Sequence, residues 1–252
     1  MLRSSNPALN DSTFRDLSYT GDAATMTLEG TASKGVVLTG LLFGAAMWTW
    51  HLAQGMMQPG GNPNLVMGWA IGGAVVALIV GFVTVFAKSW SPYTTPVYAI
   101  GEGLFLGAIS ALFNARFPGI VFQAMSLTVL CLISLLVAYR SGLIRATENF
   151  KLGMVAVTGA IGLLYLVSMI MRMFGMTVPY IHDSGPIGIG FSVFVVIVAA
   201  LNLVMDFDFI ETGVERRAPK YMEWYAAFGL LVTLVWLYVE VLRLLAKLRS
   251  RD

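Results

Sequence analysis

Four acidic side chains lie inside or at the ends of long apolar stretches of this chain. The run from Ile187 to Met205 has no charged side chain and is followed by Asp206 and Asp208. Glu102 lies in "VYAIGEGLFLGAISALF" and Glu240 in "LVTLVWLYVEVLRLLAKL". A carboxylate at membrane depth is costly, which makes it a candidate functional group. Paired carboxylates can share a proton, and once ionised they offer the oxygen ligands that calcium prefers. These acids therefore predict proton or cation handling.

Spacing along a helix separates the roles of these acids. Asp206 and Asp208 are two positions apart, about 200° around a helix, so they cannot face one partner. Asn202 lies one turn before Asp206, so we predict that Asp206 points into the bundle. Asp208 is predicted to cap the helix exit or to meet the basic loop "ERRAPK". The alternative is that both aspartates are solvated among the lipid headgroups.

The remaining ionisable candidates each allow two interpretations. Glu240 precedes Arg243 by three residues on the same helical face, so it is either a functional acid or half of a local ion pair. Glu102 lies between two glycines and is either a member of a buried network or the start of its helix. His51 follows Trp50 and is predicted to lie in the aromatic belt at the membrane interface.

The composition identifies the class of protein that must position these groups. Only 12% of the residues are charged and the mean hydropathy is +0.76, whereas soluble domains carry about 25% charged residues. The net charge of +2 comes without a basic stripe, so no nucleic-acid partner is predicted. Two histidines and the single Cys131 are too few for a catalytic zinc site or an internal disulfide. We therefore expect neither an enzyme nor a bound cofactor.

Seven apolar runs are long enough to cross a bilayer as helices. They are Val36–Leu52, Leu65–Phe86, Val97–Phe113, Ile120–Tyr139, Met154–Met171, Ile187–Met205 and Trp224–Leu245. The predicted fold is an all-α integral membrane protein, with a polar segment over residues 1–34 and a single seven-helix domain over residues 35–252. Two GxxxG pairs, Gly40/Gly44 and Gly103/Gly107, are predicted to let helices pack closely.

The basic residues of the loops predict the orientation in the membrane. More Lys and Arg fall on the side of the amino terminus than on the other side, which predicts a cytoplasmic amino terminus. The tail "RLLAKLRSRD" conflicts with this rule, because seven crossings place its basic residues outside. The side of the carboxy-terminal tail therefore stays open.

Several stretches of the chain resemble a known family. They are "RSSNPAL", "YRSGLIRATENF", "DSGPIGIGFSVF", "LNLVMDFDFIE" and "PKYMEWYAAFGLLVTLVWLYVEVLRLL". Over nearly its whole length the sequence resembles the bacterial YccA-like branch of the Bax inhibitor family. The resemblance implies a bacterial inner-membrane protein of seven helices with the last helix at the centre. It also implies a pH-sensitive calcium leak controlled by one acid on each of the last two helices. Asp206 matches the first acid, and Glu240 stands where the better-known pattern has aspartate.

This resemblance yields a mechanism and an alternative. Asp206 and Glu240 would share a proton, separate when it is lost, and then act as calcium ligands, supported by Asp208, Glu102, Asn202 and Arg243. The protein would act as a monomer in the lipid bilayer. In the alternative, it transports nothing and modulates stress or quality control by binding a membrane protease through residues 1–34. A proton-coupled carrier is a third class, but seven nearly uncharged spans offer little polar lining for a substrate.

Overall fold

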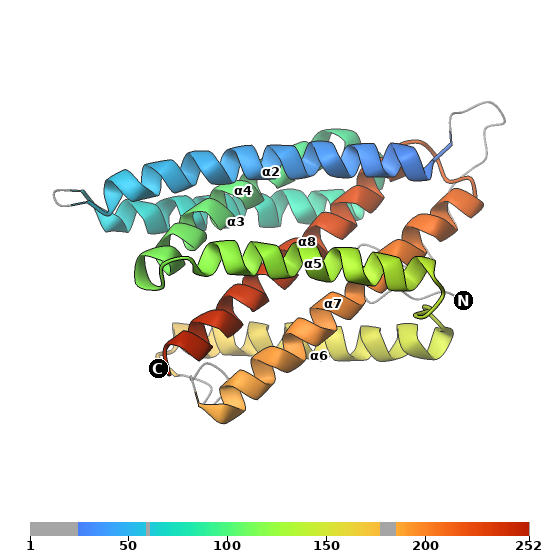
Figure 1. Ribbon diagram of the computed structural model, residues 1–252. Coiled ribbons are helices and arrows are strands. Elements are labelled where there is room, and N and C mark those ends of the chain that lie inside the picture. Colours follow the sequence, from blue (N-terminus) through green and yellow to red (C-terminus); the bar gives the residue numbers. More distant parts are fainter. Residues whose placement is uncertain (1–24, 59–60, 177–184, 252) are drawn as a thin grey trace. The chain divides into compact units, whose positions relative to one another are not determined.

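The described part of the chain is helical. The computed structural model describes residues 25–58, 61–176 and 185–251, which Figure 1 shows in colour. Its elements are α2 (Leu28–Met56), α3 (Pro63–Phe86), the 3-10 turn η1 (Lys88–Trp90), α4 (Ser91–Arg116), α5 (Ile120–Arg140), α6 (Glu148–Met173), α7 (Pro186–Glu215) and α8 (Met222–Arg249). Within these ranges there is no strand, only an isolated β-bridge between Thr25 and Pro219.

In the described part of the chain, seven helices, α2 to α8, are each long and apolar enough to cross a membrane. This confirms the prediction of an all-α fold with seven spans. The first helix begins at Leu28, earlier than the predicted Val36, and α7 continues to Glu215, well past the predicted end at Met205. Of the polar segment predicted over residues 1–34, residues 1–24 lie outside the described residues, and residues 28–34 belong to α2.

Polar caps and glycines define several helix ends. The side chains of Thr27 and Thr147 accept hydrogen bonds from the backbone of the first turns of α2 and α6, which satisfies donors that have no partner inside the helix. After α5 and α6 the chain passes through Gly142 and Gly175, both at φ +74°. This left-handed conformation favours glycine, which has no Cβ, so these residues stop the helices and reverse the chain.

The chain forms two compact units. Of the described residues, we call those within 25–121 and 210–231 the amino-terminal unit, and those within 122–209 and 232–251 the carboxy-terminal unit. The helices α7 and α8 contribute residues to both units. A single domain over residues 35–252 and a central last helix both stay predictions.

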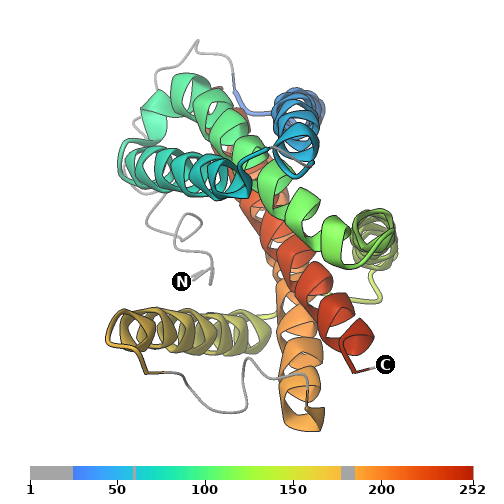
Figure 2. The same cartoon turned by 90° about the vertical axis from the view of Figure 1, so that its left-hand side faces the viewer.

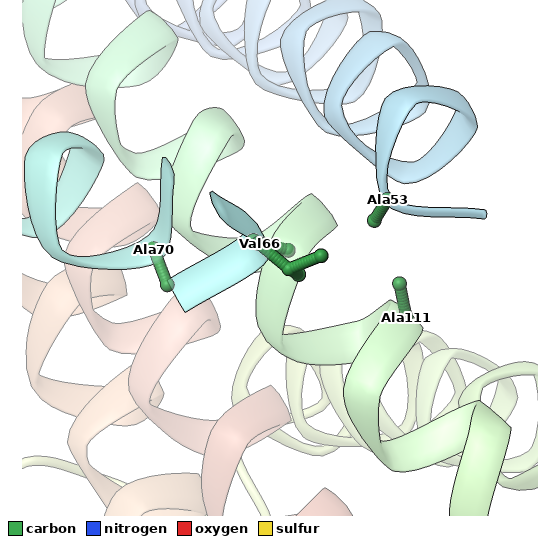
Figure 3. Packing of buried hydrophobic residues seen from close by; sticks show 5 residues of the cluster. Ala53, Val66, Ala70 and Ala111 are labelled. Atoms are coloured by element: carbon green, nitrogen blue, oxygen red, sulfur yellow. The ribbon is translucent and has the colours of Figure 1, made fainter. Parts of the chain in front are cut away.

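In the amino-terminal unit, α4 packs against both α2 and α3, as Figures 1 and 2 show. A Cβ on Gly103 or Gly107 of α4 would collide with the backbone of α2, whereas one on Gly40 or Gly44 would meet nothing. The close approach predicted from glycine pairs is therefore made by the pair in α4, and the pair in α2 makes no such approach to the described residues. Beside it, small side chains fill the cluster of Ala53, Val66, Ala70, Ala108 and Ala111 (Figure 3).

In the carboxy-terminal unit, α6 packs against α7 through an apolar seam. Its buried members are Met154, Ile161, Val195, Val198 and Met205. Lys151 and Thr158, in the first half of α6, bind Asp208 and Asn202, in the second half of α7. The two helices are therefore antiparallel. The ion pair of Lys151 with Asp208 lies beyond one end of the apolar seam, and the hydrogen bond of Asn202 with Thr158 lies within it.

Candidate functional site

Glu240 is a buried carboxylate that is already held by two donors. Its side chain is 2% exposed, and its Oε1 accepts hydrogen bonds from the Tyr165 hydroxyl at 3.0 Å and the Arg243 guanidinium at 2.9 Å. The guanidinium also lies 5.3 Å from the centre of the Tyr165 ring, a cation–π geometry. The local ion pair that the sequence allowed for Glu240 is therefore present. This pair lies within α8 and compensates the negative charge of a buried acid, whereas the hydrogen bond from Tyr165 joins α8 to α6.

Asp206 is fully buried in α7, with 0% of its surface exposed. Asn202, one turn earlier, is also buried, and its amide donates to the Thr158 hydroxyl and to the Val198 carbonyl, both at 2.9 Å. This matches the prediction that Asn202 and Asp206 share an inward face. The burial places an ionisable group in the interior of a membrane-spanning helix, where a charged side chain is costly.

Asp208 does not cap a helix exit, because α7 continues to Glu215. Its carboxylate instead forms an ion pair of 2.7 Å with Lys151 of α6, whose side chain is 6% exposed. Glu148 lies 3.8 Å from the same lysine but is largely exposed. The basic partner of Asp208 is therefore a buried lysine from another helix rather than the loop "ERRAPK". The prediction of a capping or loop-facing Asp208 was wrong in this respect.

Contacts along α6 place Asp206 and Glu240 at different depths. Asn202 reaches Thr158, whereas Glu240 is held by Tyr165, two turns further along α6. Two turns correspond to about 10 Å along a helix axis. Because α6 and α7 are antiparallel, Asp206 lies one more turn away from Tyr165. The two acids therefore stand in two polar clusters along α6, and their coupling stays a prediction.

Two other candidates from the sequence lie in the amino-terminal unit. Glu102 is half-buried in α4, between Gly101, which packs on α3, and Gly103, which packs on α2. It lies in the interior of its helix, so it is not a helix start. His51 is exposed near the end of α2, and its place at a membrane interface stays a prediction.

The described residues hold no group of three or more His, Cys, Asp or Glu side chains arranged to bind a metal ion. Calcium prefers six to eight oxygen ligands. A cation that meets Asp206 or Glu240 would therefore need backbone carbonyls or water for most of its shell.

Sequence reasoning missed three residues that organise the polar contacts. Tyr165 and Lys151 bind acids from other helices, and Glu223 binds residues near the start of α2. Tyr165 appears in the sequence as one aromatic residue in an apolar run, and Lys151 as the solvated start of a helix. A lysine one turn after the capping Thr147 gives no signal for burial.

Comparison with known proteins adds one finding. A family model described as Bax inhibitor 1 like matches residues 6–250, which is nearly the whole chain. No curated protein and no solved structure matches the chain significantly.

Proposed function

Because this chain belongs to the Bax inhibitor 1 like family, we propose that this multi-pass membrane protein is a calcium leak controlled by protons. Asp206 and Glu240 are its acidic pair. The observation that carries the proposal is the burial of both acids, one on each of the last two helices, with 0% and 1% of their surfaces exposed. Buried acids in membrane spans are expensive and are kept where an ion or a proton must be handled.

The surroundings of the two acids favour different tasks. Glu240 is held by two donors, the guanidinium of Arg243 and the hydroxyl of Tyr165. Asp206 lies one turn from Asn202, a neutral side chain that is bound to Thr158. We therefore assign the proton-sensing role to Asp206, and Glu240 serves as the acid that is held in place on α8.

Gating follows from the charge that Asp206 gains when it loses a proton. Charged side chains in the polar clusters of the carboxy-terminal unit include Lys151, Asp208, Glu148, Glu240 and Arg243. A new negative charge on Asp206 changes the balance of these charges and attracts a cation. The leak opens as the pH rises and closes as Asp206 is protonated.

Purified protein in liposomes tests this proposal. Calcium influx is followed with an enclosed dye over a pH series on both sides of neutrality. We expect flux to rise with pH, Asp206→Asn to abolish the pH dependence, and Asp206→Asn with Glu240→Gln to be no worse than the more harmful single variant. Glu29→Gln, an exposed acid of α2, is the matched control and should behave like the parent.

The absence of any calcium flux from correctly folded parent protein would reject the leak. Additive losses in the double variant would reject the coupled pair but keep a leak. The first result would leave the protein as a modulator that binds a membrane protease. The segment proposed for that binding is residues 1–34, of which residues 1–24 lie outside the described residues.

The location completes the proposal. We propose that the protein lies in the inner membrane of a bacterium with its amino terminus in the cytoplasm. Asp206 and Glu240 would then lie within the bilayer. The excess of basic residues on the amino-terminal side supports this orientation.

A further inference from the structure

A second buried acid cluster lies in the amino-terminal unit, at the start of α8. Glu223 is 0% exposed. Its Oε1 accepts hydrogen bonds from the Thr27 amide at 3.0 Å, the Thr27 hydroxyl at 2.8 Å and the Lys220 ammonium at 2.7 Å. Its Oε2 lies 3.3 Å from the ammonium of Lys34. One carboxylate thus gathers groups from α2, from the residues before α2 and from the turn before α8.

Backbone contacts extend this cluster. The Met26 amide donates to the Ala218 carbonyl at 2.7 Å, and Thr25 forms an antiparallel bridge with Pro219. Thr27 is also the capping residue of α2, because its hydroxyl oxygen accepts from the Gly30 amide at 3.0 Å. We call residues 25–31 the entry strap. The strap is fixed to the turn between α7 and α8 by backbone pairing and by the Glu223 carboxylate.

The sequence of α2 makes room for this carboxylate. A Cβ on Gly30 would collide with the carboxylate carbon and both oxygens of Glu223. A Cβ on Gly35, in the same helix, would meet nothing within 4 Å. Glycine lowers helix stability by up to about 1 kcal/mol relative to alanine. At Gly30 this cost is offset because the missing Cβ lets the Glu223 carboxylate of α8 pack closely against α2.

The charges of the cluster make its closed state depend on Glu223. Lys34 and Lys220 are held near each other by the single carboxylate between them. Without the negative charge, the two ammonium groups would repel each other and Thr27 would lose a charged acceptor. Both lysines keep partial exposure, 27% and 48% of their side chains, so water can take over their solvation. Opening of the cluster would therefore leave both ammonium groups in contact with water.

We propose that Glu223 controls a release device. Its carboxylate holds the entry strap against the first turn of α8. While the carboxylate is charged, residues 25–27 stay paired with residues 218–219 and α8 is held at its start. Loss of the charge on Glu223, or of the lysines, releases the strap and frees the first turn of the helix that carries Glu240. This device is separate from the acid pair and does not depend on calcium passage.

Cysteine labelling measures release directly. In full-length protein with Cys131→Ser, a single Thr25→Cys is reacted with a membrane-impermeant maleimide in proteoliposomes opened to both sides. We expect Glu223→Gln and Lys34→Met each to raise the labelling rate at position 25 about tenfold, which corresponds to roughly 1.4 kcal/mol of opening. Glu29→Gln neutralises an exposed acid in the first turn of α2 and should leave the labelling rate at position 25 unchanged.

A glycine pair gives a second test that leaves all charges in place. Gly30→Ala should raise the labelling rate as Glu223→Gln does, because its methyl group displaces the carboxylate. Gly35→Ala should not raise it. A disulfide between Thr25→Cys and Pro219→Cys should form readily in the parent and several-fold more slowly with Glu223→Gln. Labelling and cross-linking rates equal to the parent in both Glu223→Gln and Gly30→Ala would overturn the proposal.

Discussion

The hydroxyl of Tyr165 on α6 donates a hydrogen bond of 3.0 Å to the buried carboxylate of Glu240 on α8. This contact ties the acid of the last helix to a helix that also binds the Asn202 side chain of α7 through Thr158. Two polar contacts thus join α6 to the last two spans, α7 and α8. A movement of α6 would therefore disturb the side chains of both Asn202 and Glu240.

We predict that Tyr165→Phe lowers the stability of the protein by about 1–3 kcal/mol, because a hydrogen bond to a buried charged acceptor is lost while the ring remains. Thermal unfolding in detergent would show this as a lower midpoint. Tyr93→Phe is the matched control, since Tyr93 is 81% exposed, and it should leave the midpoint unchanged. An unchanged midpoint for Tyr165→Phe would mean that the contact adds nothing to stability.

The ion pair of Lys151 and Asp208 should show coupling in a double-mutant cycle. Lys151→Met leaves Asp208 without its cation, and we expect a cost of about 2 kcal/mol. Adding Asp208→Asn should recover part of that loss, with a coupling of about 1 kcal/mol. Glu148→Gln, which removes a mostly exposed acid at 3.8 Å from the same lysine, should cost less than about 0.5 kcal/mol. Strictly additive effects on thermal unfolding would argue against the pair.

The two glycine pairs should respond oppositely to alanine. Gly103→Ala and Gly107→Ala would force α4 away from the backbone of α2, so each should cost about 1–3 kcal/mol. Gly40→Ala and Gly44→Ala meet no atom within 4 Å and should be neutral or stabilise by up to about 1 kcal/mol. Thermal unfolding of the four variants provides the comparison. Equal responses would show that the approach of α4 to α2 is not close.

A reporter that is active only outside the cytoplasm tests the orientation. Fused ahead of α2, it should be silent, because the basic residues favour a cytoplasmic amino terminus. Fused after α8, the same reporter should be active if all seven helices cross. Activity at the amino-terminal fusion would invert the topology. Silence at both ends would show that one of the seven helices does not cross.

The number of spans could be predicted from the sequence because apolar runs of this length have few other uses. The burial of Asp206 could be predicted because Asn202 marks the same face one turn earlier, and the pairing of Glu240 with Arg243 because both lie on one helix. The partners from other helices could not be predicted. Helical periodicity does not say which face of α6 meets α7, so Lys151 with Asp208 and Tyr165 with Glu240 could not be foreseen.

The predicted helices also differ from the observed ones in where they end. The charge at Asp208 suggested that the sixth span had left the membrane, yet the helix continues to Glu215. A helix does not need to stop where the apolar run stops, because a buried lysine can neutralise an acid in its next turn. Glu223 was missed for a related reason: near the start of a span, an acid and two lysines look like ordinary interfacial charge.

The way in which α7 and α8 are divided between the two units has a consequence for synthesis. The amino-terminal unit needs residues 210–231, which the ribosome makes after the helices α5 and α6. The carboxy-terminal unit needs residues 232–252, which are made last. The amino-terminal unit therefore cannot be completed before residue 231 is made, and the carboxy-terminal unit cannot be completed before the last residues are made. We expect the first three spans to lie in the bilayer without their final partners until the start of α8 is made, so that part of their packing follows their insertion.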